Sequence, residues 1–106
     1  MIPVQLSQLA VAVDGQLVGQ DQTIDAIGTD SRALKMGDVF LALKGPNFDG
    51  HRFVGQVEQL GASALIVDHQ VESTLPQIIV EDTSIALGKA GAYIKTLAAP
   101  KKTIGI

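Results

Sequence analysis

The chain has 106 residues, the size of one ordinary domain with a single hydrophobic core. Apolar residues make up 46% and charged residues 18%, which excludes a disordered chain, and the formal net charge of -3 argues against a nucleic-acid-binding surface. The absence of cysteine excludes disulfides, thiolate catalysis and cysteine metal sites. No window reaches the ~18 apolar residues of a membrane span and the N-terminus lacks a signal peptide. We therefore expect a cytoplasmic protein with neither nucleic acid nor membrane as a partner.

Helix and strand signals alternate through the first half of the chain. Apolar residues recur at helical spacing over 6–13, and Asp14-Gly15 is a typical helix end. Gly37-Asp38 marks a turn, and the unbroken apolar run that follows predicts a strand buried on both faces. The predicted elements are a helix over 6–13 and strands over 16–19, 23–27 and 39–43.

The second half continues the alternation. Turn-forming residues precede a helix that should stop at Gly61, because glycine suits a helix end. Asp82 can cap a last helix. Its expected inward face is Ala86, Leu87, Ala90, Tyr93, Ile94 and Leu97. The predicted elements are a loop over 44–50, a helix over 51–60, strands over 64–67 and 77–80 around a polar loop over 69–76, and a helix from 82 to 97.

This order of elements predicts the fold class. Strands that alternate with helices indicate an α/β fold, a single compact domain with a mixed, largely parallel sheet flanked by helices. We expect this domain to occupy residues 1–100. Lys101-Lys102 is followed by residues 103–106, which open like a buried strand and then stop; this would leave backbone groups without partners. We therefore expect residues 101–106 to form the first strand of a following domain or the linker to it; the alternative is a natural end on an edge strand.

Polar, turn-forming clusters stand on both sides of the strand predicted over 39–43. Thr29-Asp30-Ser31-Arg32 precedes this strand and residues 44–51 follow it. Open α/β sheets bind ligands beyond the carboxyl ends of their strands, so these clusters form the candidate site.

Three side chains of the second cluster suit a nucleotide, and each also has a structural interpretation. The amide of Asn47 matches the imide edge of a pyrimidine. Phe48 could cover a base or anchor the loop in the core, and Lys44 could neutralise a phosphate or simply face solvent. The sequence therefore predicts a small polar ligand here.

Other chemistries find less support. The tripeptide Asp30-Ser31-Arg32 can be purely structural, with its acid bending the chain and its arginine pairing with a carboxylate. A Ser-His-Asp triad, and with it a free-standing hydrolase, lacks a Gly-x-Ser-x-Gly motif around Ser31, and neither histidine has a predicted orienting partner. His51 and His69 lie too far apart for a metal-ligand motif, and the chain has no glycine-rich phosphate loop. We assign no catalytic residue and no metal ligand.

The order and spacing of several motifs carry a family resemblance. The chain contains, in order, Thr29-Asp30-Ser31-Arg32, then Gly37-Asp38-Val39-Phe40-Leu41-Ala42-Leu43-Lys44-Gly45, then Phe48-Asp49-Gly50-His51. Together with residues 1–9, 61–67 and 82–88, they resemble the N-terminal domain of the Mur ligase family. The resemblance covers essentially the whole chain.

The resemblance implies a function. In this family the N-terminal domain holds the uridine diphosphate (UDP) end of a peptidoglycan precursor, a central domain binds ATP and magnesium, and a C-terminal domain helps bring in the incoming amino acid or dipeptide. The parent protein would activate the terminal carboxylate of UDP-N-acetylmuramoyl-tripeptide as an acyl phosphate, which D-alanyl-D-alanine would attack to form an amide bond. Residues 103–106 resemble the strand directly before the family's ATP loop. By this resemblance the chain alone would be inactive, would bind no cofactor and would contact its own central ATPase domain.

The resemblance also implies which residues contact UDP. In the MurE branch, contacts come from residues around the serine of Asp-Ser-Arg and from the tripeptide before Asp-Gly; carried over by position, these are Thr29, Ser31 and Pro46-Asn47-Phe48. The chain departs from MurE at that tripeptide, and Pro46 has no N–H to donate. The Lys-Gly-x-x-Phe-Asp-Gly-His form and the short N-terminus favour the branch that adds D-alanyl-D-alanine. A MurE-type substrate domain and a non-enzymatic interdomain module remain alternatives. The candidate UDP-binding residues are Thr29, Ser31, Arg32, Lys44, Pro46, Asn47, Phe48 and Asp49.

Overall fold

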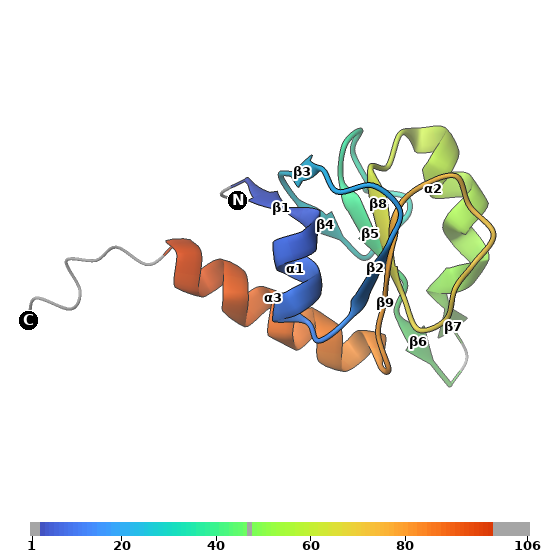
Figure 1. Ribbon diagram of the computed structural model, residues 1–106. Coiled ribbons are helices and arrows are strands. Elements are labelled where there is room, and N and C mark those ends of the chain that lie inside the picture. Colours follow the sequence, from blue (N-terminus) through green and yellow to red (C-terminus); the bar gives the residue numbers. More distant parts are fainter. Residues whose placement is uncertain (1–2, 47, 99–106) are drawn as a thin grey trace, which may run out of the picture.

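A five-stranded sheet forms the centre of the molecule in the computed structural model, which describes residues 3–46 and 48–98 (Figure 1). Four neighbouring strands run parallel, and the strand at one edge pairs antiparallel. The predicted mixed, largely parallel sheet is therefore confirmed. Across the sheet the strands are β2 (Gln16–Val18), β9 (Gln77–Ile79), β8 (Ala64–Val67), β5 (Val39–Leu41) and β4 (Ile27–Gly28).

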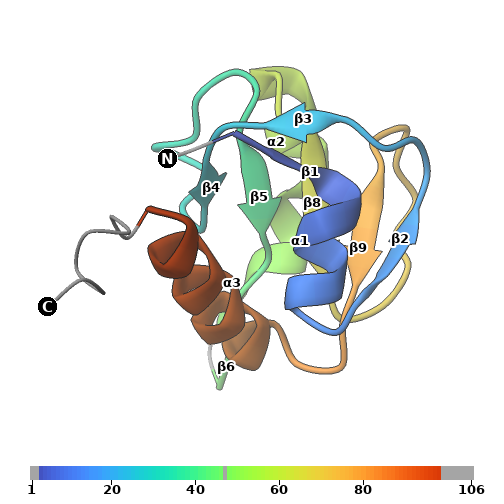
Figure 2. The same ribbon diagram turned by 60° about the vertical axis from the view of Figure 1, so that its left-hand side comes forward.

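Helices cover both faces of this sheet (Figures 1 and 2). Helices α1 (Leu6–Ala12) and α3 (Thr83–Ala98) lie on one face. Helix α2 (Val54–Leu60), which continues from the short 3-10 helix η1 (Gly50–Phe53), lies on the other face. Each face has its own cluster of buried apolar side chains, so the fold has three layers with two half-cores.

The sequence of β8 is apolar without interruption because both faces of this strand are buried. Ala64 and Ile66 pack toward α1 and α3, whereas Leu65 and Val67 pack toward α2, and all four side chains are fully buried. Successive residues of a strand face opposite layers, so both faces of β8 are buried. Burying each of the three larger side chains contributes roughly 1.5–3 kcal/mol. The strand predicted over 64–67 is confirmed.

Two small sheets differ from the predicted elements. β3 (Thr23–Ile24) pairs antiparallel with β1 (Val4–Gln5), whereas β4 pairs with β5. The single strand predicted over 23–27 is therefore wrong, because the chain changes partners in the middle of it. β5 stops at Leu41, and the loop predicted over 44–50 contains a hairpin of β6 (Lys44–Gly45) and β7 (Phe48–Asp49).

The predicted helix ends are largely confirmed. Gly61 ends α2 with a left-handed backbone, φ 93°. The carboxylate of Asp82 accepts the backbone N–H groups of Ser84 and Ile85, as a cap should. The predicted inward face of α3 is partly wrong, since Leu87 and Leu97 are 36% and 38% exposed.

Two expectations concern the C-terminal end and the membrane. The strand or linker expected over 101–106 lies outside the described residues. Within the part of the chain that the structure describes, no helix is both long enough and apolar enough to cross a bilayer.

Candidate functional site

A pocket of about 540 Å³ opens where β4 and β5 end. These strands are parallel, so their carboxyl ends share one edge of the sheet. Thr29 follows β4 directly, and Leu43 comes two residues after β5. The structure thus brings the first predicted cluster to the predicted edge. The lining consists of residues 29–32, Leu43, Phe53 and Gln56.

Asp30 and Arg32 shape the turn at the pocket. Oδ1 of Asp30 accepts the backbone N–H of Arg32 at 2.9 Å and its Nε–H at 3.3 Å. These two hydrogen bonds hold the pKa of Asp30 below its ordinary value. The structural role considered for this acid and this arginine is therefore correct, while the arginine side chain stays 86% exposed.

Ser31 differs from its two neighbours. It is only 7% exposed, yet it lines the pocket. Its hydroxyl forms no hydrogen bond with any other described residue, so the local turn bond considered for it is not observed and the hydroxyl can serve a ligand. No hydrogen bond joins it to a histidine within the described part of the chain, and the catalytic triad gains no support.

The second predicted cluster lies mostly outside this pocket. Lys44 is exposed and pairs in register with Asp49 across the β6–β7 hairpin, and Pro46 is exposed in its turn. None of these three belongs to the described lining of the pocket. Asn47 lies outside the described residues, and only the backbone of Phe48 is described.

Three pocket residues were missed from the sequence. Leu43 was assigned only to a buried strand and Phe53 only to the apolar face of a helix, and Gln56 was not considered. The available signal for Phe53 and Gln56 was their position, because both follow within seven residues of the Asp49-Gly50 turn. A helix that starts directly after a candidate loop places its first turns beside that loop.

The expectation that neither histidine has an orienting partner is wrong. Nδ1 of His51 lies 2.6 Å from Oδ1 of Asp49, and Nε2 of His51 accepts the backbone N–H of Asp68 at 3.1 Å. His69 contacts the same Asp68, with Nδ1 2.5 Å from Oδ1. The hydrogen bonds from His51 are the main cause of a lowered pKa at Asp49, and the Lys44 charge adds to them.

A second pocket, of about 450 Å³, lies at the opposite edge of the sheet. Residues 18–20 and 70–77 line it, and it contains none of the predicted site residues. Binding at this second pocket can therefore be distinguished from binding at the first pocket, because the two share no lining residue.

The sequence of this chain is similar to those of known proteins. A family model described as "Mur ligase family, catalytic domain" matches residues 23–98. The UDP-N-acetylmuramoyl-tripeptide–D-alanyl-D-alanine ligase of Escherichia coli (strain K12) is 46% identical over 95 residues, which cover 90% of this chain and 21% of the relative. The UDP-N-acetylmuramoyl-L-alanyl-D-glutamate–2,6-diaminopimelate ligase of Aquifex aeolicus is 46% identical over 67 residues, 63% of this chain and 14% of the relative.

Solved structures agree with the sequence relatives. A crystal structure of MurF from Acinetobacter baumannii superposes with a TM-score of 0.83 at 40% identity, covering 93% of this chain and 22% of that chain. The chain thus spans about a fifth of the length of such relatives. It contains no Gly-x-x-x-x-Gly-Lys-Ser/Thr loop, so the word "catalytic" in the family model does not extend to an ATP loop here. The chain belongs to the Mur ligase family, and its fold is that of a MurF N-terminal domain.

Proposed function

We propose that this chain binds the UDP end of UDP-N-acetylmuramoyl-tripeptide in a ligase that adds D-alanyl-D-alanine during peptidoglycan biosynthesis. The E. coli relative named for that reaction matches 90% of the chain, and the A. aeolicus relative named for diaminopimelate addition matches 63%. This difference in coverage supports the D-alanyl-D-alanine branch over the MurE-type alternative.

The chemistry of the pocket lining carries the proposal. Ser31 contributes a buried hydroxyl, Arg32 an exposed guanidinium and Gln56 an amide, while Leu43 and Phe53 contribute apolar surface. A uridine diphosphate presents the matching groups, because its base has apolar faces and an imide edge and its phosphates are anionic. The pocket volume of about 540 Å³ falls within the range of small-molecule sites.

The proposal also assigns steps to other parts of the enzyme. Since the chain holds no phosphate loop, it does not fit ATP. We therefore assign ATP, magnesium, the acyl-phosphate step and D-alanyl-D-alanine to parts of such a ligase beyond this chain. The role of this chain is to hold the nucleotide end of the precursor.

A titration of the ¹⁵N-labelled chain with UDP, followed by backbone amide shifts, tests this role. We expect shifts at residues 29–32 and around Phe53 and Gln56. We also expect a Kd in the ~mM range, because UDP on this chain alone makes only some of the contacts that the whole precursor would make in a complete ligase. Pyrophosphate alone should not reproduce the shifts near Phe53, since it lacks a base.

Two arginine variants give a matched comparison. Arg32→Ala should weaken UDP binding about tenfold, because charge-assisted hydrogen bonds to phosphate are among the stronger ones. Arg52→Ala removes the other arginine, which is exposed and does not line the pocket, and should leave the affinity unchanged. Equal effects of both variants would defeat the site assignment, and a chain that shows no UDP shifts at all would favour the interdomain module.

A further inference from the structure

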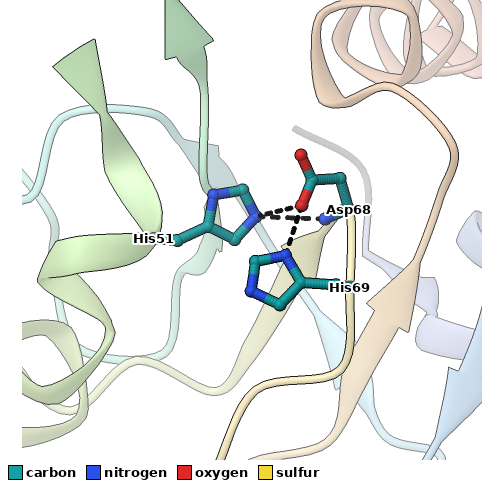
Figure 3. A group of neighbouring side chains, drawn as sticks. All are labelled: His51, Asp68 and His69. Atoms are coloured by element: carbon teal, nitrogen blue, oxygen red, sulfur yellow. Dashed lines mark hydrogen bonds and ion pairs between the residues drawn. The ribbon is translucent and has the colours of Figure 1, made fainter.

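Three potential metal ligands converge at the end of β8 (Figure 3). Asp68 and His69 follow β8 directly, and His51 reaches them from η1. Nε2 of His51 lies 3.2 Å from Oδ1 of Asp68, and Nδ1 of His69 lies 2.5 Å from the same oxygen. The ligand atoms of all three residues lie within 4.8 Å of one another.

His51 is the fixed member of this group. Its side chain is 6% exposed, and its Nδ1 lies 2.6 Å from Oδ1 of Asp49, which also accepts the His51 backbone N–H at 3.0 Å. Because Nε2 accepts the backbone N–H of Asp68, the ring proton belongs on Nδ1 and the Nε2 lone pair faces Asp68. Metal-binding histidines are typically oriented in this way by a carboxylate on their second nitrogen.

We propose that His51, Asp68 and His69 form a binding site for a divalent transition-metal ion such as Zn²⁺. Two imidazole nitrogens and one carboxylate oxygen make a donor set that zinc prefers, whereas Mg²⁺ and Ca²⁺ prefer oxygen ligands alone. Three protein ligands leave a fourth tetrahedral position for water.

Holding the ion requires the His69 ring to turn, because it stacks on the His51 ring with centroids 4.7 Å apart and 21° between the planes. Ligand atoms around a tetrahedral zinc ion lie about 3.3 Å apart, which the separation between His51 Nε2 and Asp68 Oδ1 already matches. The His69 side chain is 61% exposed, so it can turn out of this stack and toward the ion without disturbing the core. The ion replaces the Asp68 amide at Nε2 and ties the loop after β8 to η1. None of the three ligands lines the nucleotide pocket, so this site stands independently of the proposed function.

Metal titration of the chain, prepared without a histidine tag, tests the site. Competition with a chromophoric chelator should show one Zn²⁺ per chain with a Kd in the ~µM range, and no competition by Mg²⁺. Co²⁺ should give the visible absorption of a tetrahedral site. The chain has two histidines and no cysteine, so a variant that loses one histidine has no similar ligand to substitute.

Variants decide whether these residues are the ligands. His69→Ala should lower the Zn²⁺ affinity at least about tenfold, whereas Gln70→Ala, at the neighbouring exposed residue, should leave it unchanged. Asp68→Asn keeps the size of the side chain almost unchanged and should also weaken Zn²⁺ binding. A backbone amide spectrum of each variant confirms that it is folded. The proposal is overturned if Zn²⁺ shows no saturable binding, or if His69→Ala binds it as tightly as the parent chain.

Discussion

Gly50 donates its backbone N–H to the carbonyl of Leu43 at 2.6 Å, which fastens the start of η1 to the segment that leaves β5. A β-carbon at residue 50 would lie 3.0 Å from Cα of Ala42 and from the backbone N and O of Leu43. Backbone atoms cannot turn aside as a flexible side chain can. The glycine of the Phe-Asp-Gly-His motif therefore allows a close approach that helps to place Phe53 and Leu43 in one pocket.

Replacing this glycine should destabilise the fold. Gly50→Ala is expected to lower the free energy of unfolding by about 1–3 kcal/mol, because the added methyl group overpacks the backbone of β5's extension. Gly88→Ala, in the middle of α3 with open space around it, should instead raise the free energy of unfolding by about 0.5–1 kcal/mol. Urea denaturation measures both. Two changes of the same sign would contradict the packing described at Gly50.

Ser7 and Asp21 allow a prediction on the acid side. The hydroxyl of Ser7 donates to Oδ2 of Asp21 at 2.7 Å and its backbone N–H donates to Oδ1 at 2.8 Å, and these bonds lower the pKa of Asp21. A lowered folded-state pKa means that the ionised group stabilises the fold above the unfolded value of about 3.9. This contribution is lost as the pH falls through the folded pKa.

Ser7→Ala should therefore raise the pKa of Asp21 toward its ordinary value, as measured by the ¹³C shift of the carboxyl carbon during a pH titration. Ser84→Ala, at an exposed serine in the first turn of α3, is the control and should leave the Asp21 titration unchanged. If the pKa of Asp21 does not change when the Ser7 hydroxyl is lost, this hydrogen bond does not lower that pKa in solution, which would contradict the prediction.

The half-core beneath α2 should respond strongly to truncation. Leu65→Ala is expected to lower the free energy of unfolding by about 2–5 kcal/mol, because Leu65 is fully buried between β8 and α2. Val11→Ala removes carbon atoms from a side chain that is 78% exposed and should change the free energy of unfolding by no more than about 0.5 kcal/mol. Similar losses from both variants would contradict the burial pattern.

Local sequence patterns predicted the elements whose causes are local. The apolar run of β8, the stop at Gly61 and the cap at Asp82 each depend on neighbours within a few residues. The split between β3 and β4 depends instead on two distant partners, β1 and β5, which no pattern within 23–27 contains. Leu87 shows a related limit, because an apolar residue at helical spacing can still face solvent.

The candidate site shows the same division. The cluster at residues 29–32 could be placed because it follows a strand end, and its Ser31 lines the pocket there. The contact of His51 with Asp68 joins residues 17 apart and exists only because β8 runs parallel to β5 and ends beside η1. Spacing in the sequence therefore could not predict this contact, because only the arrangement of the strands brings His51 and Asp68 together.

The nucleotide site can be tested by locating the base itself. In a ¹³C-labelled sample saturated with UDP, intermolecular nuclear Overhauser effects from the uracil H5 and H6 protons should reach the side chains of Leu43 and Phe53. That result would place the base in the pocket at the ends of β4 and β5. Contacts to residues 18–20 and 70–77 in the opposite pocket, or no contacts at saturation, would contradict the assignment.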